Sequence, residues 1–188
     1  MRHKYATEAI VLSRSPLAEA SSLITLLTKE LGLVRARAQG VRKPGAKLSA
    51  ALQTLARSDV ILVRGKEGWR LSGAILVEPH FTSLTPTARE HAGRIAHLIL
   101  RLLSDIAEGE AFEIFEELLK ILPTLSEEEQ DAVEVLAALY VLQEVGVDAG
   151  EVVPQQDGRF GKAAREYAVA QRKELIVRVN RGIEASGL

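Results

Sequence analysis

The first part of the chain alternates between apolar and polar positions with a period of two, the pattern of half-buried β-strands. Residues 4–14 predict a first strand that ends in a polar turn at 15–16, and residues 21–28 predict a second. Residues 33–39 predict a third strand, in which Val34, Ala36 and Ala38 alternate with Arg35, Arg37 and Gln39. One face of this third strand is therefore small and apolar, and the other is cationic.

The next segment changes period before the strand pattern returns. Residues 48–55 place Leu48, Ala51, Leu52 and Leu55 at helical spacing, which predicts a short helix. Residues 59–64 and 69–77 then predict two further strands joined by a hairpin turn at 65–68. Five strands with a helix between the third and the fourth is the plan of the OB-fold, whose ligands lie across strands two and three and under the loops that join strands one to two and four to five.

From residue 81 onward the apolar positions recur with helical period to the end of the chain. Thr85 followed by Pro86 predicts the start of one helix, and further helices are predicted over 111–122, 127–145 and 162–181. Ser126 and Glu129 have the spacing of a capping box, and residues 147–160 are expected to be irregular. The predicted fold class is α+β with two domains: a five-stranded OB-fold barrel at 1–80 and an all-α domain at 81–188.

Charge divides the chain at the same boundary. The 188 residues have a net charge of −1, yet residues 1–80 hold 13 Lys/Arg against 6 Asp/Glu, and residues 81–188 hold 11 against 19. The balances of +7 and −8 suggest a first domain that meets a polyanion and a second domain with another task. The absence of cysteine excludes disulfides and thiolate metal sites. With no signal peptide and no apolar run long enough for a membrane span, we expect a cytoplasmic protein.

The cationic face of the third strand continues into a basic loop. Residues 35–47 carry five positive charges and no acid, and the hairpin between strands four and five adds three more. Each phosphate that such charges neutralise releases counterions, so nucleic acid is the polymer that binds them best. The alternative is a strand edge whose charges only prevent aggregation. The candidate DNA-binding residues are Arg35, Arg37, Arg42, Lys43, Lys47, Arg64, Lys66 and Arg70.

Catalytic and metal-binding patterns are missing from the sequence. The four histidines are scattered, and the motifs of zinc proteases, nucleotide-binding loops and serine hydrolases do not occur. We therefore expect no enzyme activity, no catalytic residue and no cofactor.

Three other features have two interpretations each. Eleven carboxylates between Asp105 and Glu134 form either a solvated helix surface or a metal or docking platform. The basic last helix either extends the DNA-binding surface or pairs with those acids within the fold. Trp69, the only tryptophan, is either a core residue or a platform on which a base stacks.

Several segments resemble the N-terminal half of the bacterial recombination mediator family RecO. They are 7–12, 18–32, 38–44, 52–53 and 63–65, in the family's order and spacing, within a similarity that covers residues 5–78. The resemblance implies a non-enzymatic protein that binds single- and double-stranded DNA, anneals complementary strands and assists loading of the RecA recombinase. It also implies RecR and the acidic tail of single-strand binding protein as partners, and a nucleoid-associated location.

Two departures from that family affect the expectations. Many members carry a four-cysteine zinc module in the helical half, whereas residues 147–160 contain no cysteine, so we expect no zinc. The chain is also shorter than most members, and the difference falls in the helical half. The remaining alternatives are a protein-interaction module that acts through its acidic helices and an RNA-binding OB-fold protein.

Overall fold

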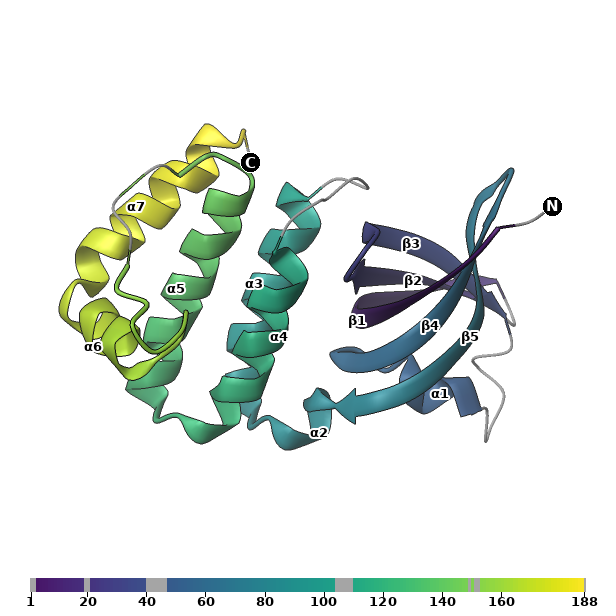
Figure 1. The fold of residues 1–188 in the computed structure, drawn as a ribbon, viewed down its shortest axis with the longest axis horizontal. Coiled ribbons are helices and arrows are strands. Elements are labelled where there is room, and N and C mark those ends of the chain that lie inside the picture. The colour runs from purple at the N-terminus through teal and green to yellow at the C-terminus, as the bar shows by residue number, and fades with distance from the viewer. Residues whose placement is uncertain are drawn as a thin grey trace. The chain divides into compact units, whose positions relative to one another are not determined.

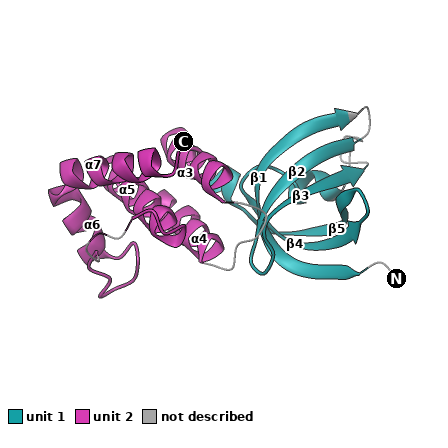
Figure 2. Ribbon diagram, turned by 90° about the horizontal axis from the view of Figure 1, so that it is seen from above, with its two compact units in different colours: residues 1–83, 104–108 teal, residues 84–103, 109–188 magenta. Residues whose placement is uncertain are grey.

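The structure is a computed structural model that describes residues 3–18, 21–39, 47–103, 110–148, 150 and 153–187. It divides the chain into two compact units, one built on residues 1–83 with 104–108 and the other on residues 84–103 and 109–188 (Figure 2). The described part of the chain contains no helix that is both long enough and apolar enough to span a bilayer. Each unit has its own hydrophobic core.

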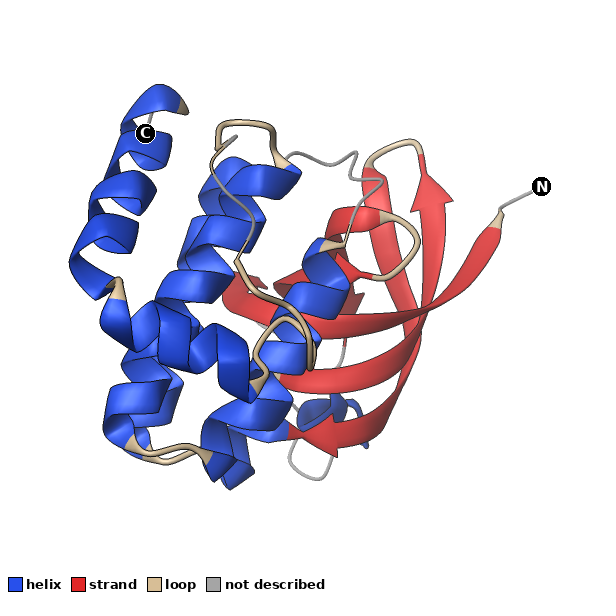
Figure 3. Cartoon of the chain, turned by 60° about the vertical axis from the view of Figure 1, so that its left-hand side comes forward, coloured by secondary structure: helices blue, strands red, loops and turns tan. Residues whose placement is uncertain are grey.

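The first unit is a closed five-stranded barrel, shown with labels in Figure 1 and in red in Figure 3. Its strands are β1 (Lys4–Ala18), β2 (Ser21–Thr28), β3 (Gly32–Gln39), β4 (Ala56–Gly65) and β5 (Gly68–Pro79), in the spatial order β1-β2-β3-β5-β4. All neighbouring pairs are antiparallel except β3 and β5, which are parallel. The barrel followed by helices confirms the predicted OB-fold and helical fold class.

The barrel closes because β1 bends and pairs with two partners. Its first part lies beside β4 and its last part lies beside β2, with irregularities in the register between Val11 and Ser13 and between Pro16 and Ala18. Such bulges bend a strand and tolerate proline. The prediction that the strand stops at Ser15–Pro16 was therefore wrong, since pairing with β2 continues to Ala18.

Alternate residues of the strands fill the barrel. Ile24 and Leu26 of β2, Val34 and Ala36 of β3, and Leu62 of β4 are almost completely buried in one cluster. The residues between them on β3, including Arg35 and Arg37, are exposed, as the period-two pattern predicts. The small side chains of β3 leave room for the larger side chains of neighbouring strands.

The short helix α1 (Lys47–Ala51) lies between β3 and β4, as predicted, but it is shorter than the pattern indicates. Leu55 adopts a left-handed conformation with φ of 63°, and its backbone N–H donates to the carbonyl oxygen of Val11 at 2.8 Å. This bond ties the turn after α1 to the barrel and prevents the helix from continuing. Leu52 and Leu55 are nonetheless buried, so the apolar spacing reflects burial more than helix length.

The second unit consists of helices, which follow the one-turn helix α2 (His80–Ser83) of the first unit. They are α3 (Pro86–Leu102), α4 (Ala111–Ile121), the 3₁₀-helix η1 (Leu122–Thr124), α5 (Glu127–Glu144), α6 (Lys162–Ala170) and α7 (Arg172–Ala185). Helix α5 is in contact with α3, α4, α6 and α7 and is buried around most of its circumference. It is the centre of this unit's core.

The helix starts were predicted well, and one helix was predicted as continuous where the structure has two. Thr85 Oγ1 accepts a hydrogen bond from the Ala88 N–H at 3.2 Å, and Ser126 forms the expected capping box with Glu129. The predicted helix 162–181 is interrupted at Gln171, which caps both α6 and α7. The interruption redirects the chain, and both helices thereby pack against α5.

Candidate nucleic-acid interface

The parallel pairing of β3 with β5 brings predicted cations together on the barrel. Ala36 lies opposite Trp69 and Arg37 lies opposite Arg70, while β4 places Arg64 opposite Trp69. The tight hairpin between β4 and β5 carries Lys66 and Glu67, and Gly68 has φ of 103°, which favours glycine. Strand β3 and the β4–β5 hairpin, which are separate in the sequence, therefore share one surface.

These residues line a surface hollow of about 700 Å³. Four of its lining residues are exposed cations predicted from the sequence: Arg37, Arg64, Lys66 and Arg70. We call this the hairpin hollow. Glu67 is its only acidic residue among those described, and its Oε2 accepts a hydrogen bond from Arg37 Nη1 at 3.2 Å.

Two exposed arginines lie side by side on neighbouring strands of the barrel. Like charges on directly opposed residues of neighbouring strands are destabilising. Arg37 and Arg70 occupy such a pair at the point where the barrel closes, and the exposed Glu67 offsets part of the repulsion. A bound anion would offset it further. The two neighbouring cations therefore suit an anionic ligand.

Aromatic contacts hold the base of the hairpin hollow. Trp69 is partly buried and packs against the barrel core, and it makes a T-shaped contact with Tyr5 at a ring separation of 5.2 Å and an interplanar angle of 78°. The guanidinium carbon of Arg64 lies over the indole ring, 4.9 Å from its centroid. Trp69 therefore packs on the core, as one of the two interpretations predicts, and it also lines the hairpin hollow. Stacking of a base on Trp69 stays a prediction.

The other predicted cations lie elsewhere or outside the described structure. Arg35 is exposed on the same outward side of β3, two residues from Arg37, but does not line the hairpin hollow. Arg42 and Lys43 lie outside the described residues, and so does the side chain of Lys47. Of the eight candidates, the structure brings four together.

The acidic helices of the second unit are largely neutralised within that unit. Six of the nine described carboxylates in the acidic run pair with a basic residue of the same unit. These carboxylates are Glu110, Glu116, Glu117, Glu129, Asp131 and Glu134. Their partners include Arg159, Arg165 and Arg172, so these cations of the basic C-terminal region serve the fold. This favours the second interpretation of that region, internal pairing.

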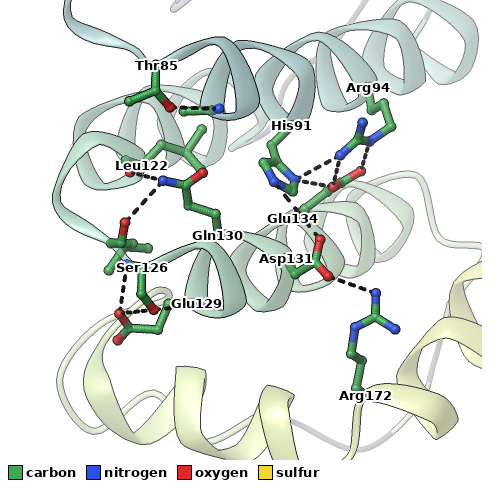
Figure 4. Close-up of polar contacts among 12 residues, drawn as sticks. Thr85, His91, Arg94, Leu122, Ser126, Glu129, Gln130, Asp131, Glu134 and Arg172 are labelled. Carbon is green, nitrogen blue, oxygen red and sulfur yellow. Dashed lines mark hydrogen bonds and ion pairs between the residues drawn. The ribbon is translucent and has the colours of Figure 1, made fainter.

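A polar network that the sequence did not reveal joins α3, α5 and α7 (Figure 4). Glu134 accepts hydrogen bonds from Arg94 at 2.5 and 2.7 Å and lies 2.5 Å from Nδ1 of the buried His91. Asp131 pairs with Arg172 at 3.0 Å. His91 and Arg94 are three residues apart on one helix, as are Asp131 and Glu134 on another, and this spacing was the available signal.

The network contains a three-residue group that has metal-ligating atoms. His91, Asp131 and Glu134 offer ligand atoms within 4.8 Å of one another. However, the Arg94 fork occupies both oxygens of Glu134, and the hydrogen bonds that Arg94 donates to Glu134 raise the pKa of the Arg94 guanidinium above its ordinary value. A cation at this place would compete with that guanidinium. The geometry is that of an ion-pair network that joins helices.

Elsewhere in the protein, hydrogen bonds from arginine side chains lower the pKa of two carboxylates, Glu8 and Asp148. A hydrogen bond from Arg57 lowers the pKa of Glu8, which also pairs with Lys29 at 3.3 Å. A fork of hydrogen bonds from Arg178 lowers the pKa of Asp148. The first pair joins β1 to β4, and the second anchors α7 to the segment after α5. Neither contributes to the hairpin hollow.

The fold defines the class of the chain: an OB-type barrel protein with a helical domain. The family model described as "Recombination protein O N terminal" matches residues 1–80, the barrel. The barrel of this chain therefore matches the N-terminal domain of the RecO family.

Curated relatives support this assignment. The chain is 36% identical over 111 residues to the DNA repair protein RecO of Heliobacterium modesticaldum, covering 58% of this chain and 41% of that protein. It is 33% identical over 151 residues to the protein of the same name from Gloeobacter violaceus, covering 79% of this chain and 57% of the relative. It is 39% identical over 80 residues to the DNA repair protein RecO of Synechococcus elongatus, covering 43% of this chain and 30% of that protein. The chain therefore spans less than two thirds of the length of these relatives.

Proposed function

We propose that this chain is a non-enzymatic DNA-binding protein of recombinational DNA repair. The observation that carries the proposal is the hairpin hollow, where Arg37, Arg64, Lys66 and Arg70 gather on the family-matched barrel. The hollow lies at the hairpin between strands four and five and beside strand three, where OB-folds bind oligonucleotides. The name shared by the relatives, DNA repair protein, supports DNA as the ligand.

The proposed binding is electrostatic and requires no chemical step. Each arginine or lysine that meets a phosphate releases counterions from the strand, so affinity falls steeply as salt rises. A surface that neutralises phosphates on one strand also lowers its repulsion toward a complementary strand. The barrel thereby favours annealing, with DNA positioned by its backbone and not read by sequence.

The proposed partners follow from the family and not from contacts in this structure. They are single- and double-stranded DNA, the mediator RecR and single-strand binding protein, and the proposed cellular task is help in loading RecA onto protein-coated strands. The acidic helices contribute less to this proposal, because most of their described carboxylates already have internal partners.

A strand-annealing assay tests the proposal. Two complementary strands of about 30 nucleotides carry a donor and an acceptor dye, and energy transfer is followed with and without the protein at about 50 and 200 mM salt. We expect faster annealing at the lower salt and a much smaller effect at the higher salt. An unchanged annealing rate at low salt, with no binding of either strand, would contradict the proposal.

A competition experiment separates DNA from RNA as the ligand. Unlabelled DNA and RNA strands of equal length and sequence compete with a labelled DNA strand for the protein. The proposed role in DNA repair predicts that DNA competes at least as well as RNA. Much stronger competition by RNA would instead support the RNA-binding alternative.

A further inference from the structure

Arg64 differs from Arg37, another cation of the hairpin hollow, in the side chain that it contacts. Its guanidinium lies over the indole of Trp69, and Trp69 itself makes a T-shaped contact with Tyr5 and packs on the barrel core. Arg37, by contrast, pairs with the exposed Glu67. One cation is therefore placed on an aromatic stack, and another is engaged with a competing carboxylate.

The stack changes what Arg64 offers to a ligand. A guanidinium is planar and stacks on aromatic faces, whereas a lysine ammonium is a hydrated point charge. Bases that are not paired stack on arginine planes as well as on aromatic rings. Because Trp69 already restrains Arg64, less side-chain freedom is lost when a base packs there.

We propose that Arg64, held over Trp69, is a stacking site for one unpaired base and makes the barrel prefer single-stranded over duplex DNA. The inference rests on the proposed function and specifies its ligand. In a duplex the base faces are covered by their neighbours, so only backbone phosphates reach the hollow. A single strand presents both phosphates and free base faces. The hollow has a volume of about 700 Å³.

Trp69 supplies a direct readout because it is the only tryptophan in the chain. Its emission is recorded during titration with oligothymidylate of about 12 nucleotides, within the site size of one or a few OB-folds. Inorganic polyphosphate, which has the charge but no base, is the comparison ligand. We expect oligothymidylate to change the emission strongly at saturation and polyphosphate to bind with little change.

Arg64→Lys keeps the charge and removes the planar group. We expect this variant to lose about fivefold or more in affinity for oligothymidylate, the lower end of one base-stacking contact. Its affinity for polyphosphate and for duplex DNA is expected to change less than twofold. The matched control is Arg70→Lys, which alters the same hollow in the same way at a position opposite Arg37. It should leave the ratio of single-strand to duplex affinity unchanged.

The outcomes separate this inference from the proposed function. If Arg64→Lys binds oligothymidylate as tightly as the unchanged protein, Arg64 contacts only phosphate and the inference is overturned while DNA binding stands. Equal emission changes with oligothymidylate and polyphosphate also overturn it. If the unchanged protein binds none of these ligands, the proposed function fails and the inference fails with it.

Discussion

Replacing Glu67 by glutamine should increase the affinity of the barrel for DNA. Among the described residues that line the hairpin hollow, Glu67 is the only acid, and it pairs with Arg37 at 3.2 Å. The side chains are 84% and 51% exposed, so the ion pair is a surface pair. A phosphate that binds Arg37 has to replace this carboxylate, and the substitution removes the competitor.

The size of the effect follows from the exposure of the pair. Exposed ion pairs contribute about 0.2 to 1 kcal/mol, so releasing Arg37 should tighten binding by about 1.5- to 5-fold. The same substitution should change the free energy of unfolding by less than about 1 kcal/mol. The gain should be greatest at low salt, where surface charges are least screened.

Fluorescence anisotropy with a labelled single strand measures the change. The matched control is Asp59→Asn, which removes an exposed acid from the same barrel five residues along β4 from Arg64. It should have a smaller effect because it does not line the hollow. If the Glu67→Gln variant binds the strand no more tightly than the unchanged protein does, the claim that Glu67 competes with phosphate for Arg37 is refuted.

Four further outcomes follow from the structure. Arg70→Ala should weaken binding of all sequences alike and reduce the slope of log affinity against log salt by about one, measured by salt titration. Leu62→Ala, at a fully buried barrel position, should cost about 2 to 5 kcal/mol in chemical denaturation. Because Arg57 lowers the pKa of Glu8, that pair stabilises the fold above the unfolded carboxyl pKa of about 4.3 and stops doing so as pH falls through the folded pKa. Melting curves of Glu8→Gln should accordingly differ from the unchanged protein at pH 7 and converge with it in acid. Ser126→Ala should cost about 1 kcal/mol in denaturation through loss of the capping box, whereas Ser126→Thr, which keeps the capping hydroxyl, should cost less.

The strands were predictable because the alternation of apolar and polar residues that marks a strand lies within the strand's own sequence. Alternation along β3 separates the buried Val34 and Ala36 from the exposed Arg35 and Arg37 without reference to any other strand. The order of strands and helix then pointed to one barrel plan. Helix starts were equally local, since Thr85 and Ser126 cap the residues that follow them.

What escaped prediction depends on contacts between distant segments. Helix α1 ends early because the backbone N–H of Leu55 donates a hydrogen bond to the carbonyl oxygen of Val11, 44 residues earlier. No local sequence pattern contains that hydrogen bond. The break at Gln171 likewise follows from packing on α5. The link between His91 and Glu134 spans 43 residues and joins two helices whose relative placement the sequence does not define.

The candidate site was partly predictable for the same reason. The sequence identified its cations by composition, and the barrel plan placed strand three near the hairpin that follows strand four. It did not reveal that Arg37 faces Arg70, that Glu67 pairs with Arg37, or that Arg64 rests on Trp69. Those side-chain contacts decide how the surface would bind an anion. They form only when the closed barrel brings β3 next to the β4–β5 hairpin.

The most direct test of the central claim compares two double variants in a salt titration of DNA binding. Arg37→Ala with Arg70→Ala removes two cations from the hairpin hollow, and Lys120→Ala with Lys162→Ala removes two exposed cations from the helical unit. Binding of a labelled single strand is followed by anisotropy between about 50 and 200 mM salt. The account predicts that the first variant binds much more weakly, with a salt slope smaller by about two, and that the second binds almost as the unchanged protein does. Equal losses in both variants, or none in the first, would contradict the claim that the barrel surface binds DNA.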